Sequence, residues 1–123
     1  MARRTILVVE DHPVDRELVV DVLEAAGYTV LQAQDGCGLL ERVKATRPDL
    51  IVLDLQLPAV DGFTLARLIT AEPVTQGIPI LAISAYAAPQ QQAQAKAAGC
   101  AGFLTKPLDT RGLVQTVARL AGR

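Results

Sequence analysis

The sequence alternates short, β-branched apolar runs with longer segments that carry an apolar stripe. Three of the runs are almost continuous, at 6–9 (ILVV), 50–53 (LIVL) and 80–83 (ILAI). Runs of this kind are typical of strands buried on both faces, as in a parallel sheet, whereas half-exposed antiparallel strands alternate apolar and polar residues. Weaker runs at 29–31 and 102–105 indicate two more strands. The pattern therefore predicts a five-stranded parallel sheet.

The segments between these runs predict helices. In the first, Pro13 suits the first helical position, Gly27 suits the C-terminal stop, and apolar residues recur every four residues between them. Similar stripes occur over three later segments, 39–43, 65–69 and 113–120. The segment 89–98 is rich in Gln and Ala, so it is compatible with a helix that has little apolar face. Alternating strands and helices form right-handed βαβ units, so we expect an α/β fold with five helices on both faces of an open sheet.

Length and composition narrow the class of protein. The 123 residues, half of them hydrophobic, suit one domain over 1–123. The formal net charge is -1 and no basic stripe is visible, so no nucleic-acid partner is expected. Cys37 and Cys100 lack metal-ligand spacing and are expected to be reduced. The sequence contains neither a signal-peptide pattern nor an apolar stretch of the roughly 20 residues that span a bilayer. We expect a cytoplasmic protein without a membrane partner.

Polar side chains that suit chemistry follow four of the five predicted strands. They are Glu10 and Asp11 after the first, Asp54 after the third, Ser84 after the fourth and Lys106 after the fifth. Each alone has a plainer interpretation as a loop or cap residue, and an acid pair before a helix also favours its N-terminal end. Because the carboxyl ends of parallel strands meet at one edge, where open α/β sheets bind ligands, we expect the five to converge.

The expected cluster suits a metal ion and a phosphoryl group. Three carboxylates repel one another unless a cation neutralises them, and Mg²⁺ prefers hard oxygen ligands. A lysine adds a second positive charge, and a transferring phosphoryl group is stabilised by such cationic contacts. Carboxylates form aspartyl phosphates, so Asp54 is the natural nucleophile.

Four segments carry a resemblance to a known family, namely 6–11 (ILVVED), 49–62 (DLIVLDLQLPAVDG), 78–85 (IPILAISA) and 98–107 (AGCAGFLTKP). Together they resemble the receiver domains of two-component response regulators, and the resemblance extends over nearly the whole chain. It implies the CheY-like fold with strand order 2-1-3-4-5. It also implies a single receiver domain without an output domain, as in the stand-alone regulators of the family.

The resemblance implies a role for each matching residue. Asp54 would be phosphorylated by a histidine kinase or a phosphotransfer protein. Mg²⁺, or Mn²⁺ in its place, would be bound by Asp11, Asp54 and the backbone carbonyl of Gln56, while Glu10 would act through water.

Further roles implied by the resemblance concern the last two strands. Ser84 would hydrogen-bond the phosphoryl oxygens, small Ala85 would leave access open, and Lys106 would pair with the phosphoryl group. Phe103 occupies the position of the family's switch aromatic, although an aromatic residue in a strand also suits a plain core role. The Lys106–Pro107 peptide bond is expected to be cis.

Two features depart from the common pattern or leave its effect open. His12 stands where Asp or Asn is common, and we expect it to be a cap or exposed residue rather than a ligand. Gln56 and Tyr86 occupy positions that tune the lifetime of the phosphoryl group in the family. The sequence does not tell whether these residues lengthen or shorten that lifetime here.

The sequence thus predicts a single-domain response regulator whose output is an altered contact with a downstream protein. The expected surface combines the helix from Pro89, the fifth strand and the last helix, on a monomer or weak dimer. It would promote its own phosphoryl transfer and hydrolysis without being a turnover enzyme. Alternatives are a phosphate sink in a phosphorelay, a flavodoxin-type carrier and an aspartyl-phosphate phosphohydrolase. The last normally has a second acid two residues after its nucleophile, where this chain has Gln56.

Overall fold

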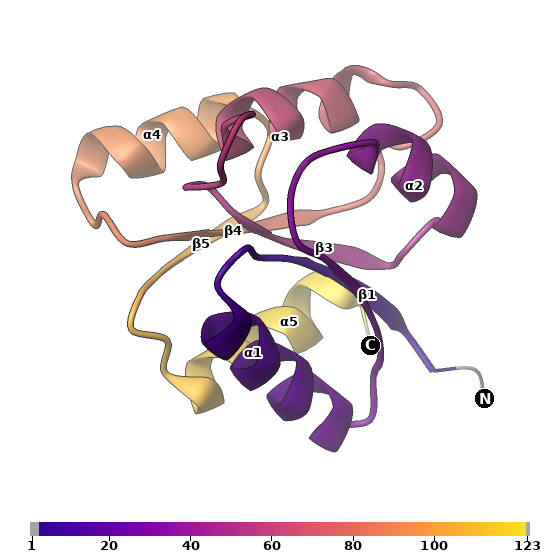
Figure 1. Ribbon diagram of the computed structural model, residues 1–123, viewed down its shortest axis with the longest axis vertical. Helices are drawn as coiled ribbons and strands as arrows, with labels where there is room; N and C mark the ends of the chain where they lie inside the picture. Colours follow the sequence, from indigo (N-terminus) through magenta and orange to yellow (C-terminus); the bar gives the residue numbers. More distant parts are fainter. Residues whose placement is uncertain (1–2, 123) are drawn as a thin grey trace.

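The computed structural model describes residues 3–122 and contains, within them, one parallel sheet of five strands (Figure 1). Its strand order is β2-β1-β3-β4-β5. In chain order the strands are β1 (Thr5–Val9), β2 (Thr29–Ala33), β3 (Leu50–Asp54), β4 (Ile80–Ser84) and β5 (Gly102–Thr105). The predicted α/β class, the parallel sheet and its order are confirmed.

The helices lie on both faces of the sheet (Figure 1), as predicted. Helices α1 and α5 cover one face, and α2, α3 and α4 cover the other. Their bounds are α1 (Pro13–Ala25), α2 (Leu39–Thr46), α3 (Gly62–Ala71), α4 (Pro89–Ala97) and α5 (Thr110–Ala121). In the described part of the chain, no helix is long and apolar enough to cross a membrane.

The continuous apolar runs are explained by burial on both faces. In β1, Ile6 and Val8 pack into the core with α1 and α5, whereas Leu7 and Val9 pack into the core with α2 and α3. Residues of β3 and β4 alternate in the same way, and all are buried. Burial of each such side chain contributes about 1.5–3 kcal/mol, so these three strands form the most stable part of the sheet.

The loop after β3 is folded tightly against the strand end. A Cβ atom on Gly62 would lie 2.6 Å from Leu55 Cα and 2.8 Å from the carbonyl oxygen of Asp54, so a larger residue would displace the backbone. The Gly62 amide donates to the Leu55 carbonyl at 3.1 Å. This close approach holds Asp54 at the carboxyl-end edge of the sheet, where β1, β4 and β5 also end.

Candidate functional site

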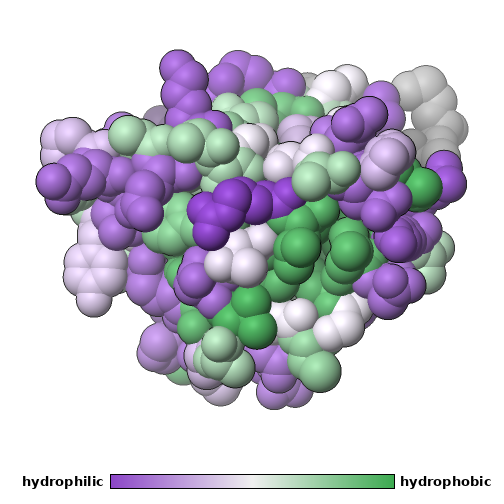
Figure 2. Space-filling view, turned by 90° about the horizontal axis from the view of Figure 1, so that it is seen from above, coloured by the Kyte–Doolittle hydropathy of each residue, from purple (hydrophilic) through white to green (hydrophobic). Residues whose placement is uncertain are grey.

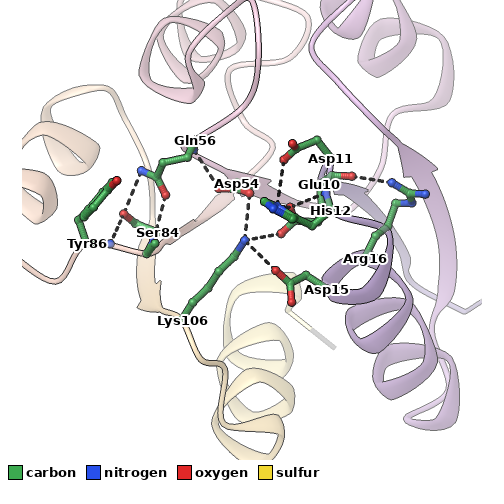
Figure 3. Close-up of polar contacts among 11 residues, drawn as sticks. Glu10, Asp11, His12, Asp15, Arg16, Asp54, Gln56, Ser84, Tyr86 and Lys106 are labelled. Carbon is green, nitrogen blue, oxygen red and sulfur yellow. Dashed lines mark hydrogen bonds and ion pairs between the residues drawn. The ribbon is translucent and has the colours of Figure 1, made fainter.

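Acidic side chains from two strand ends meet at this edge, as the sequence predicted (Figure 3). Glu10 and Asp11 follow β1, and Asp54 ends β3, the neighbouring strand. Glu10 and Asp54 are almost fully buried, with 4% and 2% of their surfaces exposed. Asp11 is partly exposed at the mouth of the site. The arrangement therefore places two buried carboxylates beneath a third that solvent can reach.

Lys106 reaches this cluster from the end of β5. Its Nζ atom lies 2.8 Å from Glu10 Oε1, 3.1 Å from Asp54 Oδ2 and 3.2 Å from Asp15 Oδ2. Burial alone lowers the pKa of Lys106, but hydrogen bonds to Glu10 and Asp54 outweigh that effect and hold the pKa above its usual value. The site thus contains a permanently charged ammonium group beside the Asp54 carboxylate.

Asp15, the third partner of Lys106, was not among the residues predicted for this site. Asp15 lies in the first turn of α1, the helix that begins shortly after the acid pair that follows β1. A helix that follows a strand begins at the same edge, so an acid in its first turn is a usable sequence signal. Arg16, the next residue, donates from Nη1 to the Glu10 carbonyl oxygen at 2.9 Å and fixes the backbone of the acid pair.

Electrostatic crowding is visible at Glu10. Burial and, after it, neighbouring Asp54 raise the pKa of Glu10 to about 7, although the hydrogen bond to Lys106 opposes both. One ammonium group therefore does not fully compensate the carboxylates, and the cluster has a place for additional positive charge.

The donor set fits a hard divalent cation. Ligand atoms of Glu10, Asp11, His12 and Asp54 all lie within 4.8 Å of one another. Asp11 Oδ1 is buried and has no hydrogen-bond partner among residues 3–122, which is costly for a carboxylate oxygen without a cation. Carboxylate oxygens in this number suit Mg²⁺, which retains several water ligands.

His12 lies at the N-cap of α1, with 69% of its side chain exposed. Its Nδ1 atom is 3.6 Å from Asp11 Oδ1 and 3.7 Å from Glu10 Oε2, too far for a hydrogen bond. Its amide nitrogen donates to Glu10 Oε2 at 3.2 Å. His12 is therefore exposed and stands at the N-cap position, as expected, although its side chain makes no capping hydrogen bond.

A hydrogen-bonded network joins the ends of β3 and β4 (Figure 3). The Gln56 amide donates to Asp54 Oδ1 at 2.9 Å. The Gln56 side chain extends to the next strand, where Nε2 donates to Ser84 Oγ at 3.1 Å and Oε1 accepts from the Ala85 amide at 2.9 Å. Ser84 Oγ also accepts from the Tyr86 amide at 3.0 Å. These side-chain contacts of Gln56 were not predicted from the sequence, which indicated a backbone ligand and a position that tunes phosphoryl lifetime.

The remaining predicted residues lie at the edges of the site. Ala85 and Tyr86 are exposed, and the Lys106–Pro107 peptide bond is cis. Phe103 lies apart from the carboxylates, partly buried against a small apolar cluster that includes Leu55 and Ala95. The structure therefore brings together every predicted polar group, whereas the predicted switch aromatic belongs to the layer beneath α4.

Comparison with known proteins identifies the family. The model of the response regulator receiver domain matches residues 6–118, which is most of the chain. This chain belongs to that family. The resemblance inferred from the four sequence motifs is therefore confirmed.

Individual relatives are similar over almost their whole length. The polar-differentiation response regulator DivK of Brucella anthropi is 28% identical over 119 residues, 97% of both chains. A putative response regulator of Chloroflexus aurantiacus has a TM-score of 0.94 at 31% identity, covering 99% of this chain and 100% of the other. The receiver domain of a sensor histidine kinase of Pseudomonas aeruginosa, with a magnesium ion coordinated in its active site cleft, has a TM-score of 0.90 at 31% identity, covering 99% and 100%.

Proposed function

We propose that this receiver domain accepts a phosphoryl group on Asp54 from a histidine kinase or phosphotransfer protein and signals as a single-domain response regulator. The observation that supports it best is the state of the Asp54 carboxylate. It is buried, Oδ1 accepts from the Gln56 amide, and Oδ2 lies 3.1 Å from the Lys106 ammonium. An anionic nucleophile that is fixed in this way, beside a cation, suits an incoming phosphoryl group.

A divalent cation, Mg²⁺ or Mn²⁺, would be held by Asp11, Asp54 and the backbone carbonyl of Gln56, with Glu10 acting through water. When bound it would neutralise the carboxylates and the incoming phosphoryl charge. The unpartnered Asp11 Oδ1 and the crowding at Glu10 support this assignment.

The residues of the chain would perform the transfer by positioning and charge. An Asp54 carboxylate oxygen forms a bond to phosphorus as the bond between phosphorus and the donor's histidine nitrogen breaks. The donor nitrogen keeps the electron pair. Lys106 and the Ser84 hydroxyl would bind the phosphoryl oxygens, and exposed Ala85 would leave the approach open. Such charge-assisted hydrogen bonds contribute about 1.5–3 kcal/mol each.

The output would be a changed surface around α4, β5 and α5, read by a downstream protein. A groove of about 410 Å³ lies between α4 and β5 and is lined in part by Gln92, Lys96 and Phe103. A rearrangement of the loop after Ser84 would move α4 and change this groove. We expect the chain to act in the cytoplasm, as a monomer or weak dimer, and to hydrolyse its own phosphoryl group without turning over other substrates.

The test is phosphorylation by acetyl phosphate in the presence of Mg²⁺, followed by intact-protein mass spectrometry. The wild-type chain should gain one phosphoryl group, and Asp54→Asn should gain none. Asp35→Asn is the matched control, because Asp35 is an exposed acid beyond the end of β2 at the same edge. Undiminished phosphorylation of Asp54→Asn would contradict the proposal, and hydrolysis of generic phosphate esters would favour a phosphohydrolase instead.

A further inference from the structure

The Gln56 carboxamide makes contacts that its family role as a backbone ligand does not require. It leaves the loop after β3 and bonds to two successive residues at the end of β4, Ser84 and Ala85 (Figure 3). Ser84 is fully buried, and Ala85 starts the exposed loop that leads to α4. A single side chain therefore links the loop that follows Asp54 to the loop that leads to α4.

The orientation of this carboxamide is determined by its surroundings. The Ala85 backbone amide is a donor, so it must face the carbonyl oxygen of Gln56 rather than its NH₂ group. The NH₂ group then faces Ser84 Oγ, which also accepts from the Tyr86 amide. Both lone pairs of the Ser84 oxygen are thereby occupied, and the Ala85 amide donates to Gln56 instead of pointing freely toward Asp54.

A phosphoryl group on Asp54 would need the same donors. Its oxygens are acceptors only, so they compete with Gln56 Oε1 for the Ala85 amide and require the Ser84 hydroxyl to turn its proton toward them. The resting contacts and the phosphoryl contacts therefore exclude each other at Ala85.

We propose that the Gln56 side chain is a resting-state latch, which holds Ser84 and Ala85 away from the phosphoryl group until that group displaces it. This inference rests on the proposed function, because it assumes that Ser84 and Ala85 bind the phosphoryl oxygens. It assigns a sign to a position whose effect the sequence left open. Gln56 restrains activation, and its removal favours the activated arrangement.

The latch predicts the behaviour of two variants. Gln56→Met keeps the length of the side chain but cannot form either hydrogen bond, and Gln56→Ala removes the side chain beyond Cβ. Both keep the backbone amide that holds Asp54 and the backbone carbonyl. Gln34→Ala is the matched control, since Gln34 is an exposed glutamine at the end of β2 on the same edge.

The probe is beryllofluoride, a phosphoryl mimic, titrated in the presence of Mg²⁺ and followed by amide NMR spectra. In the wild type, binding must first break one neutral hydrogen bond, and both Gln56 variants lack this bond. They should therefore bind beryllofluoride roughly twofold to tenfold more tightly, whereas the control should not. The rate of Asp54 phosphorylation by acetyl phosphate should rise in parallel. Without the probe, the Ala85 amide should exchange its hydrogen faster in both variants than in the wild type.

Each result has a defined meaning. Unchanged or weaker beryllofluoride binding in both Gln56 variants, with a normal wild type, would overturn the latch and leave the proposed function intact. An unchanged exchange rate of the Ala85 amide would overturn it as well, since the resting hydrogen bond would then be negligible. A wild-type chain that gains no phosphoryl group on Asp54 would overturn the proposed function, and the latch with it.

Discussion

Helices α4 and α5 flank β5 but are held in very different ways. Helix α5 buries Leu113, Val117 and Ala121 in the core, and the side chain of Asp109 caps its N-terminus. Helix α4 buries Ala95 alone, and the side chain of its N-cap residue, Ala88, makes no capping hydrogen bond. Figure 2 views the face of the molecule that carries α2, α3 and α4, and the surface on its α4 side is mostly hydrophilic or weakly hydrophobic.

The difference indicates where the molecule can move at low cost. Displacing α5 would expose a large apolar area, whereas displacing α4 would expose a smaller one, formed by Ala95 and the small apolar cluster beneath it. Helix α4 also follows the loop that Gln56 restrains through Ala85. A change at Asp54 can therefore reach the surface through α4 while α5 and the three buried strands stay in place.

The largest test of this comparison is a truncation in α5. Leu113→Ala should lower the free energy of unfolding by about 2–5 kcal/mol, because Leu113 is 1% exposed and its loss leaves a cavity. Exposed Gln94→Ala in α4 should change it by less than about 0.5 kcal/mol. Urea unfolding followed by circular dichroism measures both values, with exposed Gln115→Ala as the α5 surface control. Similar losses for Leu113→Ala and Gln94→Ala would break the comparison.

The two cysteines provide a chemical test of how often α4 leaves the sheet. Cys37 is exposed, whereas Cys100 lies partly buried just after α4, and burial raises the pKa of Cys100 to about 11. Because the thiolate is the reactive form, iodoacetamide at pH 8 should modify Cys100 at least about 100-fold more slowly than Cys37. The Cys100 rate should rise with pH, since deprotonation increases toward pH 11. Mass spectrometry measures both rates, and equal rates would mean that α4 opens readily.

The sequence was sufficient to predict the rigid part of the fold. Uninterrupted apolar runs such as 6–9 and 80–83 are typical of strands in a parallel sheet that is buried on both faces. The polar residues that follow such strands then lie at one edge of the sheet. The weak apolar character of 89–98 was also visible from composition, and the structure shows the corresponding lack of burial in α4.

What the sequence could not supply are contacts made by flexible side chains across the site. The Gln56 carboxamide and the Asp15 carboxylate each reach residues at least 29 positions away, Ala85 and Lys106. Such contacts depend on the distance between strand ends and on rotamers, neither of which leaves a periodic pattern. Sequence reasoning therefore identified polar groups that the fold brings together at this edge and missed the side chains that hydrogen-bond to them.

A substitution at the C-terminal end of α4 should have an intermediate effect on stability, because a glycine there lies very close to α3. Gly99 has a φ of 97°, and a Cβ atom there would lie 2.6 Å from Thr70 Cγ2 of α3. Thr70 also donates from Oγ1 to the Ala98 carbonyl at 3.0 Å. Gly99→Ala should therefore lower the free energy of unfolding by about 1–3 kcal/mol.

The matched control is Gly77→Ala, because no neighbouring atom lies within 4 Å of the position its Cβ would take. Urea unfolding should show little change for that variant. If Gly99→Ala were equally neutral, α4 would be loosely held at both ends. If it is destabilising as expected, the comparison becomes sharper, because α4 is then anchored at its C-terminal end and free mainly at the end next to Ser84.

The smallest expected effect comes from strengthening that free end. Ala88 is the N-cap of α4, Pro89 occupies the first helical position, and Gln91 occupies the third. The Oε1 atom of Gln91 is buried and has no hydrogen-bond partner in the described part of the chain. Ala88→Ser would supply a capping hydroxyl and complete a capping box with Gln91, which should stabilise the helix by about 0.5–1 kcal/mol. Hydrogen exchange should slow in the first turn of α4 and stay unchanged in α5. Ala88→Val, which cannot cap, is the control.

The same variant tests whether α4 moves during activation. If the added cap also weakens beryllofluoride binding, the N-terminal end of α4 must move. If binding is unchanged, the movement is confined to the loop after Ser84, and α4 stays in place relative to the sheet, as α5 does.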